Sequence, residues 1–243
     1  MKKVSLTEAK HLLESQNTRI LKYRYGMVEV PMEDILYMIE PSTEAQKYVD
    51  FYNSHPAFAT VPAGAKWHHW WKGGLEEHLK EMIGMGLDLL ELYPGDLNGK
   101  INRSDVIIAC FLHDFAKIWA YVPISEEDRQ KNPKKYLEKQ EFKYSEDAFR
   151  ILPDEHKTLL ELARHGIAPS DKQWSAVIFS EGGYSDANFG YANTRTTAGN
   201  HVNTDNALAP FIHMLDMYSS QILGKSLYGM PEKPVEELAA KAE

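Results

Sequence analysis

The sequence predicts an all-α fold, and three observations support this prediction. Apolar residues between 75 and 90 recur at intervals of three and four, the period of an α-helix with one buried face. Capping residues precede several apolar runs, as Ser170 with Gln173 does, and mark where helices begin. Only residues 23–30 have the pattern of a short strand pair, so we expect no sheet in the core.

The chain is expected to divide into an N-terminal helical extension (1–50), a main domain (51–225) and a charged tail (226–243). A stretch rich in Gly, Asn and Thr, residues 184–204, has no apolar period and is predicted to be a long loop that could cover a site as a lid. The predicted helices are 6–16, 31–40, 42–51, 75–90, 104–117 starting at Ser104, 145–152, 153–164, 170–182 and a last one around Asp216.

Composition narrows the class of protein. The chain has 243 residues, 43% of them hydrophobic and 26% charged, which is ordinary for a globular protein with a sizeable core. Its single cysteine, Cys110, cannot form an intrachain disulfide. No apolar stretch is long enough to span a membrane and no signal-type segment follows the first residues, so we expect a cytoplasmic protein without a membrane partner.

The charge balance bears on nucleic-acid binding. A net charge of -8 disfavours a long polyanion as partner, because such partners are gripped by clustered Lys and Arg. One segment, residues 129–143, carries six cations and two acids. It is interpreted as a solvated connector, or alternatively as a loop that faces a phosphate. Nucleic acid is therefore a possible but not a favoured partner, and the sequence does not predict the oligomeric state.

His113 and Asp114 form the most informative motif. The pair ends the apolar run 109–112, where an imidazole and a carboxylate are costly to desolvate unless something neutralises them. A divalent metal does so directly, since both groups are good ligands. The alternative is a helix end with a salt-bridged His and a solvated Asp.

Two other helices carry similar residues on apolar faces. His78 shares a face with Leu75 and Met82. Asp216 lies in an apolar helix beside Ile212 and Leu215, where a carboxylate needs a cation, a cap or a bend toward solvent. Each has a simpler interpretation, because a core histidine can bond a carbonyl and an Asp can cap a helix or bend toward solvent. Together with the His113–Asp114 pair they indicate a metal site.

These residues resemble the HD-domain superfamily of metal-dependent phosphohydrolases. Residues 68–78 read H-H-x-x-x-G-G-L-x-E-H, similar to the opening motif of a branch that includes 3′→5′ exoribonucleases and a relaxase-associated domain. Residues 113–117 read H-D-x-x-K, similar to the H-D-I-G-K box. The resemblance covers residues 51–223 and implies an HD-domain helical bundle.

The resemblance implies a ligand set and a chemistry. His78, His113, Asp114 and Asp216 would hold one divalent metal (Mn, Mg, Co, Ni, Fe or Zn), which activates a water for attack on phosphorus. Asp114 would also orient or deprotonate that water.

Roles outside the metal set are expected for neighbouring residues. Lys117, one helical turn after His113, would contact phosphate, or else complement the helix dipole. His69 is expected to be catalytic as a proton donor, and His68 and Trp71 to bind substrate. Packing is the alternative for all three, with one of the two histidines expected to be structural.

The pattern also departs from the family. Ser180 stands where one branch carries a second-metal histidine before a Gly-Gly turn. One metal is therefore expected, with His165 as a possible second-site ligand or a helix-end residue. Glu181 would be a replacement ligand, a base or a surface acid.

The predicted function is a metal-dependent phosphohydrolase, a phosphomonoesterase or phosphodiesterase, that acts on a nucleotide or related small phosphate ester. Alternatives are a 3′→5′ exonuclease or oligonucleotide phosphodiesterase, a non-catalytic nucleotide-binding module, and, less favoured because second-site histidines are not evident, a diiron oxygenase.

Overall fold

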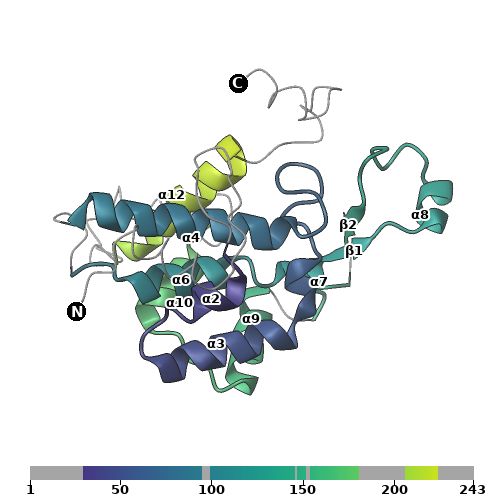
Figure 1. Cartoon of the computed structure of the whole chain (residues 1–243). Coiled ribbons are helices and arrows are strands. Elements are labelled where there is room, and N and C mark those ends of the chain that lie inside the picture. Colours follow the sequence, from purple (N-terminus) through teal and green to yellow (C-terminus); the bar gives the residue numbers. More distant parts are fainter. Residues whose placement is uncertain (1–29, 95–98, 146, 152–153, 181–205, 224–243) are drawn as a thin grey trace, which may run out of the picture.

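The computed structural model describes residues 30–94, 99–145, 147–151, 154–180 and 206–223, which form a mostly helical bundle (Figure 1). The all-α prediction is confirmed, since the described residues contain only a short two-stranded sheet beside the helices. The helical elements are α2 (Met32–Leu36), α3 (Ser42–Ser54), the 3-10 turn η1 (Pro56–Ala59), α4 (Gly74–Leu92), α6 (Arg103–His113), α7 (Lys117–Ala120), α8 (Glu126–Lys131), α9 (Asp154–Arg164), α10 (Asp171–Ile178), α12 (Leu208–Tyr218) and the π-helical turn η3 (Ser219–Leu223).

The core lies where α4, α6, α10 and α12 pack on one another. In Figure 1, α4 and α12 lie above α6 and α10, and α3 lies below them. Gly86 permits this close packing, because a Cβ there would lie 2.5 Å from Val106 Cγ1 and 3.0 Å from Leu215 Cδ1. The side chains of α4, α6 and α12 therefore meet at short range.

Helix α6 begins and ends differently from the prediction. A capping box between Asn102 and Asp105 starts it, so the cap is Asn102 and not Ser104. The helix ends at His113 rather than at residue 117, because Asp114 leaves the helical conformation with φ -112° and ψ 13°. This break places the His113–Asp114 pair at a helix end, where both side chains can face a common centre.

Other boundaries vary in accuracy. The predictions for α3, α4 and α9 are confirmed to within a few residues, and the capping box of Ser170 with Gln173 starts α10 as expected. The predicted helix 31–40 ends earlier, at Leu36, and residues 37–40 form turns and bends. Residues 147–151 form turns, so the predicted helix 145–152 is wrong, and α10 ends at Ile178 and not at 182.

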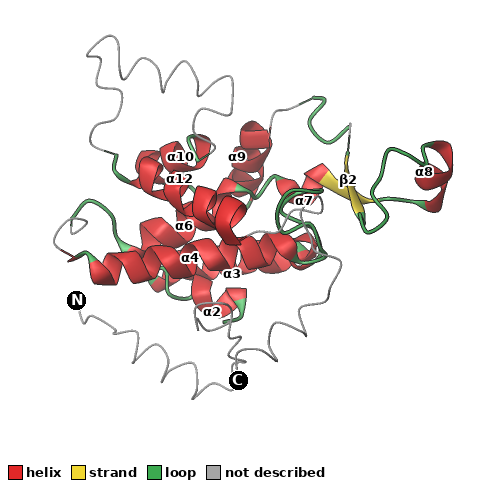
Figure 2. Ribbon diagram, turned by 90° about the horizontal axis from the view of Figure 1, so that it is seen from above, coloured by secondary structure: helices red, strands yellow, loops and turns green. Residues whose placement is uncertain are grey.

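An arm that the sequence did not predict leaves the bundle after α7. Strands β1 (Tyr121–Pro123) and β2 (Phe142–Tyr144) pair antiparallel, with Val122 opposite Lys143, and α8 lies between them. Figures 1 and 2 show this arm projecting from the helices. Arg129 donates to the carbonyls of Leu137 and Gln140, which ties the cation-rich segment into the arm.

Several predicted segments lie outside the described residues: the helix 6–16, the strand pair 23–30 except for Val30, Glu181, the loop 184–204 and the tail 226–243. The domain boundaries likewise stay predictions. Within the described ranges, no helix combines the length and the apolar character needed to cross a membrane.

Candidate metal centre

Three helices bring four ligand-type side chains together. His78 Nε2, on α4, lies 3.3 Å from His113 Nε2, 3.4 Å from Asp114 Oδ2 and 3.3 Å from Asp216 Oδ1. His113 Nε2 lies 3.3 Å from Asp114 Oδ2 and 4.0 Å from Asp216 Oδ1. The convergence expected from the sequence is therefore present, although 138 residues separate His78 from Asp216 along the chain.

Hydrogen bonds fix which nitrogen of each imidazole faces this centre. His113 Nδ1 donates to the carbonyl of Cys110 at 2.7 Å. His78 Nδ1 lies 2.9 Å from Ser219 Oγ, which itself donates to Glu81 Oε2 at 2.6 Å and so accepts from the His78 Nδ1–H. Both rings therefore direct Nε2 at the centre, the arrangement usual for metal-bound histidines.

The electrostatics of the centre suit a cation. Burial alone would raise the pKa of Asp114, but the charges of His113 and Lys117 hold that pKa well below its ordinary value. Burial opposes ionisation of Asp216 too, and a hydrogen bond from His78 leaves its pKa lowered. Burial would lower the pKa of His78, yet hydrogen bonds with the two carboxylates raise it. Two carboxylates and two imidazole nitrogens at a largely buried point fit a divalent transition metal.

Lys117 lies at the same centre. Its Nζ is 2.5 Å from Asp114 Oδ2, and its side chain is 23% exposed. Because α6 breaks at Asp114 and α7 begins at Lys117, the ammonium reaches back over the broken turn. Burial would lower the pKa of Lys117, but the Asp114 charge raises it, so the ammonium is charged.

The Gly-Gly motif has a steric cause. A Cβ on Gly74 would lie 2.0 Å from the carbonyl oxygen of His69, so only glycine lets the loop press on the start of α4. Gly73 precedes it with φ +79°, and His69 itself has φ +42°, a backbone conformation uncommon outside glycine. This contact sets the histidine loop against α4 and its His78.

His68 and His69 have different surroundings. His69 is 1% exposed, and its Nε2 lies 3.1 Å from Glu81 Oε2. His68 is only partly buried, with its ring centroid 5.2 Å from that of His78. Burial first, and then the Lys117 charge, lower the pKa of His68 to about 2. His68 is therefore neutral, and it is more accessible than His69.

The tryptophans line the same loop. Trp71 Nε1 donates to Glu77 Oε2 at 2.8 Å, and its ring lies 5.2 Å from that of His69. Trp67 is 66% exposed. Both rings are accessible on the loop that leads to the centre.

Sequence reasoning missed Glu81 and Ser219. Together they link His69 to His78 through a chain of buried hydrogen bonds. The sequence does carry a signal for Glu81, because it lies three residues after His78, on a helix face that is otherwise apolar. Ser219 carried no comparable signal, since only the fold of α12 onto α4 brings it to His78.

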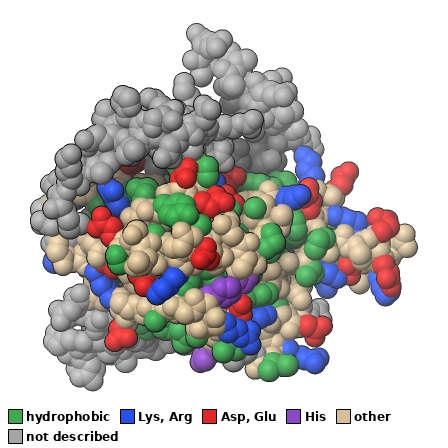
Figure 3. Space-filling model, turned by 60° about the horizontal axis from the view of Figure 1, so that its bottom comes forward, with side chains coloured by type: hydrophobic (Ala, Val, Ile, Leu, Met, Phe, Trp, Pro, Cys, Tyr) green, Lys and Arg blue, Asp and Glu red, His purple; other side chains and the backbone are tan. Residues whose placement is uncertain are grey.

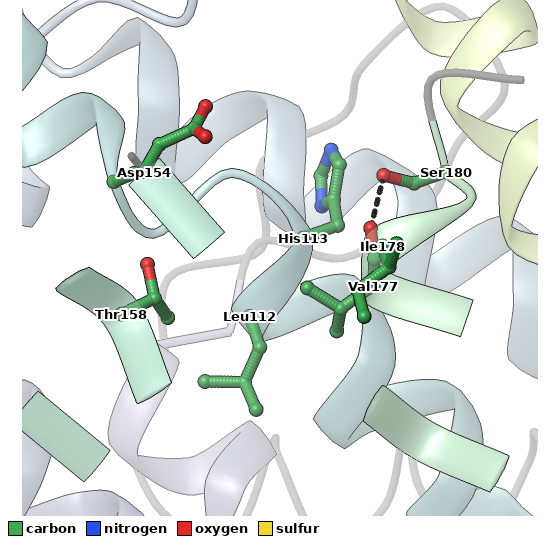
Figure 4. A pocket seen from close by; sticks show the side chains of 8 residues that line it. Leu112, His113, Asp154, Thr158, Val177, Ile178 and Ser180 are labelled. Carbon is green, nitrogen blue, oxygen red and sulfur yellow. Dashed lines mark hydrogen bonds between the residues drawn. The ribbon is translucent and has the colours of Figure 1, made fainter. Parts of the chain in front are cut away.

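A small cavity lies beside His113. Its volume of about 20 Å³ is enough for one water. Figure 4 shows His113, Asp154, Thr158 and Ser180 around it, with the Ser180 hydroxyl donating to the Val177 carbonyl. The cavity is too small for a nucleotide, so it is a candidate water position next to the centre.

His165 lies elsewhere. Its Nε2 is 3.5 Å from Glu161 Oε1, and its ring packs on Phe51, at the end of α9. Gly166 follows with φ +66°, so the expected helix end is present. Among the described residues, the ligand-type group that includes His165 is formed with His55 and Glu161.

Comparison with known proteins gives one partial similarity. The chain is 31% identical over 62 residues to a dihydroneopterin 2′,3′-cyclic phosphate phosphodiesterase of Methanocaldococcus jannaschii. The match covers 26% of this chain and 25% of that enzyme, so the chain spans about a quarter of the relative's length. No family model and no solved structure matches the chain.

Proposed function

We propose that the chain is a metal-dependent phosphohydrolase that holds one divalent metal with His78, His113, Asp114 and Asp216. The observation that carries this proposal is the convergence of their four ligand atoms, with the two imidazoles oriented by separate hydrogen bonds. The partial similarity to a phosphodiesterase supports the same reaction class.

The metal's chemistry explains why the chain needs few other groups. A divalent metal in this set would polarise a phosphoryl oxygen and lower the pKa of a nearby water. Asp114, whose pKa is held well below its ordinary value, is a weak base. We therefore assign it to ligation and to orienting the attacking water rather than to taking the proton.

Lys117 and His68 are the candidate substrate contacts. The Lys117 ammonium is charged and partly exposed beside Asp114, so it can neutralise a phosphoryl oxygen as a point charge. His68 is neutral and partly accessible, which suits a hydrogen bond to the substrate. His69 is bonded to Glu81 and buried, so we give it a positioning role in place of the proton-donor role expected from the sequence.

The substrate class follows from charge and from the relative. The net charge of -8 favours a small phosphate ester over a long polyanion. The name of the relative adds a 2′,3′-cyclic phosphodiester to the nucleotide esters expected from the sequence. Trp71 offers a ring for base stacking on the loop that leads to the centre.

A substrate panel tests this proposal. Purified protein is depleted of metal, reloaded with Mn²⁺, Co²⁺, Ni²⁺, Zn²⁺, Mg²⁺ or Fe²⁺, and offered nucleoside monophosphates, 2′,3′- and 3′,5′-cyclic nucleotides and a labelled oligonucleotide. Metal-dependent hydrolysis of the small esters is expected. Shortening of the oligonucleotide alone would favour the exonuclease, and tight nucleotide binding without turnover would favour the binding module.

A further inference from the structure

A second group of ligand-type side chains lies at the ends of α3 and α9. His55 Nε2 is 3.6 Å and His165 Nε2 is 3.5 Å from the same oxygen, Glu161 Oε1. The ligand atoms of these three residues all lie within 4.8 Å of one another. Two imidazoles and a carboxylate form a frequent donor set of zinc sites.

The tautomer of His55 is fixed by the backbone. Its Nδ1 lies 2.8 Å from the carbonyl oxygen of Phe51, which can only accept, so Nδ1 carries a proton. Ser54 Oγ supports this arrangement, because it donates to the same carbonyl and lies 2.9 Å from Nδ1. In the neutral ring the lone pair is therefore on Nε2, 3.6 Å from a carboxylate oxygen, and a proton or a metal ion between the two atoms would relieve their repulsion.

Glu161 is oriented as well. Arg164 donates to its Oε2 at 2.9 Å, which leaves Oε1 for the two histidines. Burial would raise the pKa of Glu161, but the Arg164 hydrogen bond and charge lower it, so the carboxylate is ionised. One oxygen is thus held by a cation of the chain, and the other remains available as a ligand.

Aromatic packing holds the two imidazoles in place. The ring of Phe51 lies 5.1 Å from His165, edge to face, and the ring of Phe115 lies 5.2 Å from His55. The side chains of the group remain 14% to 30% exposed, so solvent can supply a fourth ligand. Figure 3 views the molecule from the side of α3 and shows histidine side chains at the surface.

We propose that His55, Glu161 and His165 form a second metal site, one that binds Zn²⁺ with a water in the fourth position and clamps α3 to α9. The site shares no residue with the four-residue centre, and its three ligand-type side chains form a group of their own. The site does not depend on the phosphohydrolase proposal, but the expected total of two zinc ions assumes that the four-residue centre binds zinc as well.

Zinc stoichiometry tests this site. Full-length protein is stripped with a chelator and dialysed against Zn²⁺ buffered by a competing chelator. Wild type is expected to bind two equivalents and His165→Gln one, with affinity at the lost site falling by about 100-fold or more. His156→Gln, an exposed histidine on the same helix, is the matched control and is expected to bind two.

A second readout separates this proposal from the first. In Asp114→Ala the remaining zinc is expected to raise the unfolding temperature, and adding His165→Gln is expected to remove that rise, because only a folded state with an intact site binds. Circular dichroism without metal checks the fold of each variant. Equal zinc binding by wild type and His165→Gln would overturn the second site. The two histidines would then form only ion pairs with Glu161. Loss of zinc in His165→Gln but not in Asp114→Ala would instead count against the four-residue centre.

Discussion

The two ligand-type groups of this chain differ in how they are built. The four-residue centre draws on three helices, and its His78 is fully buried. The group of His55, Glu161 and His165 forms where two helices end, and its side chains keep contact with solvent. Buried charges must be paired or ligated, whereas exposed ones can be satisfied by water.

The buried centre also has more hydrogen bonds that orient its side chains than the surface group of His55, Glu161 and His165. Ser219, Glu81 and the Cys110 carbonyl orient the buried histidines, while the surface group relies chiefly on the Phe51 carbonyl and Arg164. The buried centre is thus pre-organised for a function that needs fixed geometry. The surface group is better suited to a stabilising ion.

Asp114→Ala should abolish turnover. It removes a ligand and the oriented water together, so the rate with the best substrate of the panel should fall about a thousandfold or more. The fold should persist, because the substitution opens no large cavity in the core, and circular dichroism checks this. Full activity in this variant would place the chemistry elsewhere.

Ser219→Ala should weaken metal binding at the buried centre. It leaves the His78 Nδ1–H without its acceptor and Glu81 without its donor, and such supporting contacts are worth about 10- to 100-fold in affinity. Competition with a chelating dye measures this. The neighbouring Ser220→Ala, also buried, is the control and should leave affinity unchanged. Equal metal affinities of the two variants would mean that Ser219 does not support metal binding by His78.

Gly86→Ala should destabilise the bundle through overpacking. The new Cβ meets Val106, whose branched side chain cannot swing away, at a cost of about 1–3 kcal/mol that outweighs the gain in helix propensity. Chemical denaturation measures the free energy of unfolding. Metal binding at the buried centre should weaken with it, whereas zinc binding by the surface group should not. Unchanged stability would mean that α4, α6 and α12 pack less tightly than described.

Metal affinity at the buried centre should rise with pH. Hydrogen bonds with Asp114 and Asp216 raise the pKa of His78 above its ordinary value in the metal-free protein, so a proton competes with the metal for Nε2. Affinity should therefore fall by up to about tenfold for each pH unit below that pKa. Titration calorimetry at several pH values measures this affinity. The His165→Gln variant is used, because it keeps the buried centre and lacks the proposed second site. An affinity independent of pH would contradict the proton competition.

The sequence predicted most helices because their apolar periods and capping boxes are local. The faces of α3 and α4 and the start of α10 could be identified from such patterns. It did not predict the break after His113, because nothing local marks Asp114 as the end of a helix that continues in pattern to Lys117. The arm of β1 and β2 was missed for a related reason, since strands of three residues carry no period.

The convergence of the four residues of the buried centre could be predicted because each places a polar group on or beside an apolar face. His78, the His113–Asp114 pair and Asp216 all have this signature, and in the structure His78 Nε2 lies within 3.4 Å of a ligand-type atom of each of the other three residues. The proximity of His55 to Glu161 and His165 could not be predicted from the sequence. These residues lie at the ends of two helices more than 100 residues apart, and only the packing around Phe51 brings the two ends together.

The most direct test is a crystal structure of the full chain grown with Mn²⁺, with anomalous scattering recorded at a wavelength that distinguishes this metal. We expect a peak bonded to His78 Nε2, His113 Nε2 and a carboxylate oxygen from each of Asp114 and Asp216. Manganese bound elsewhere, with this position empty at saturating metal, would contradict it.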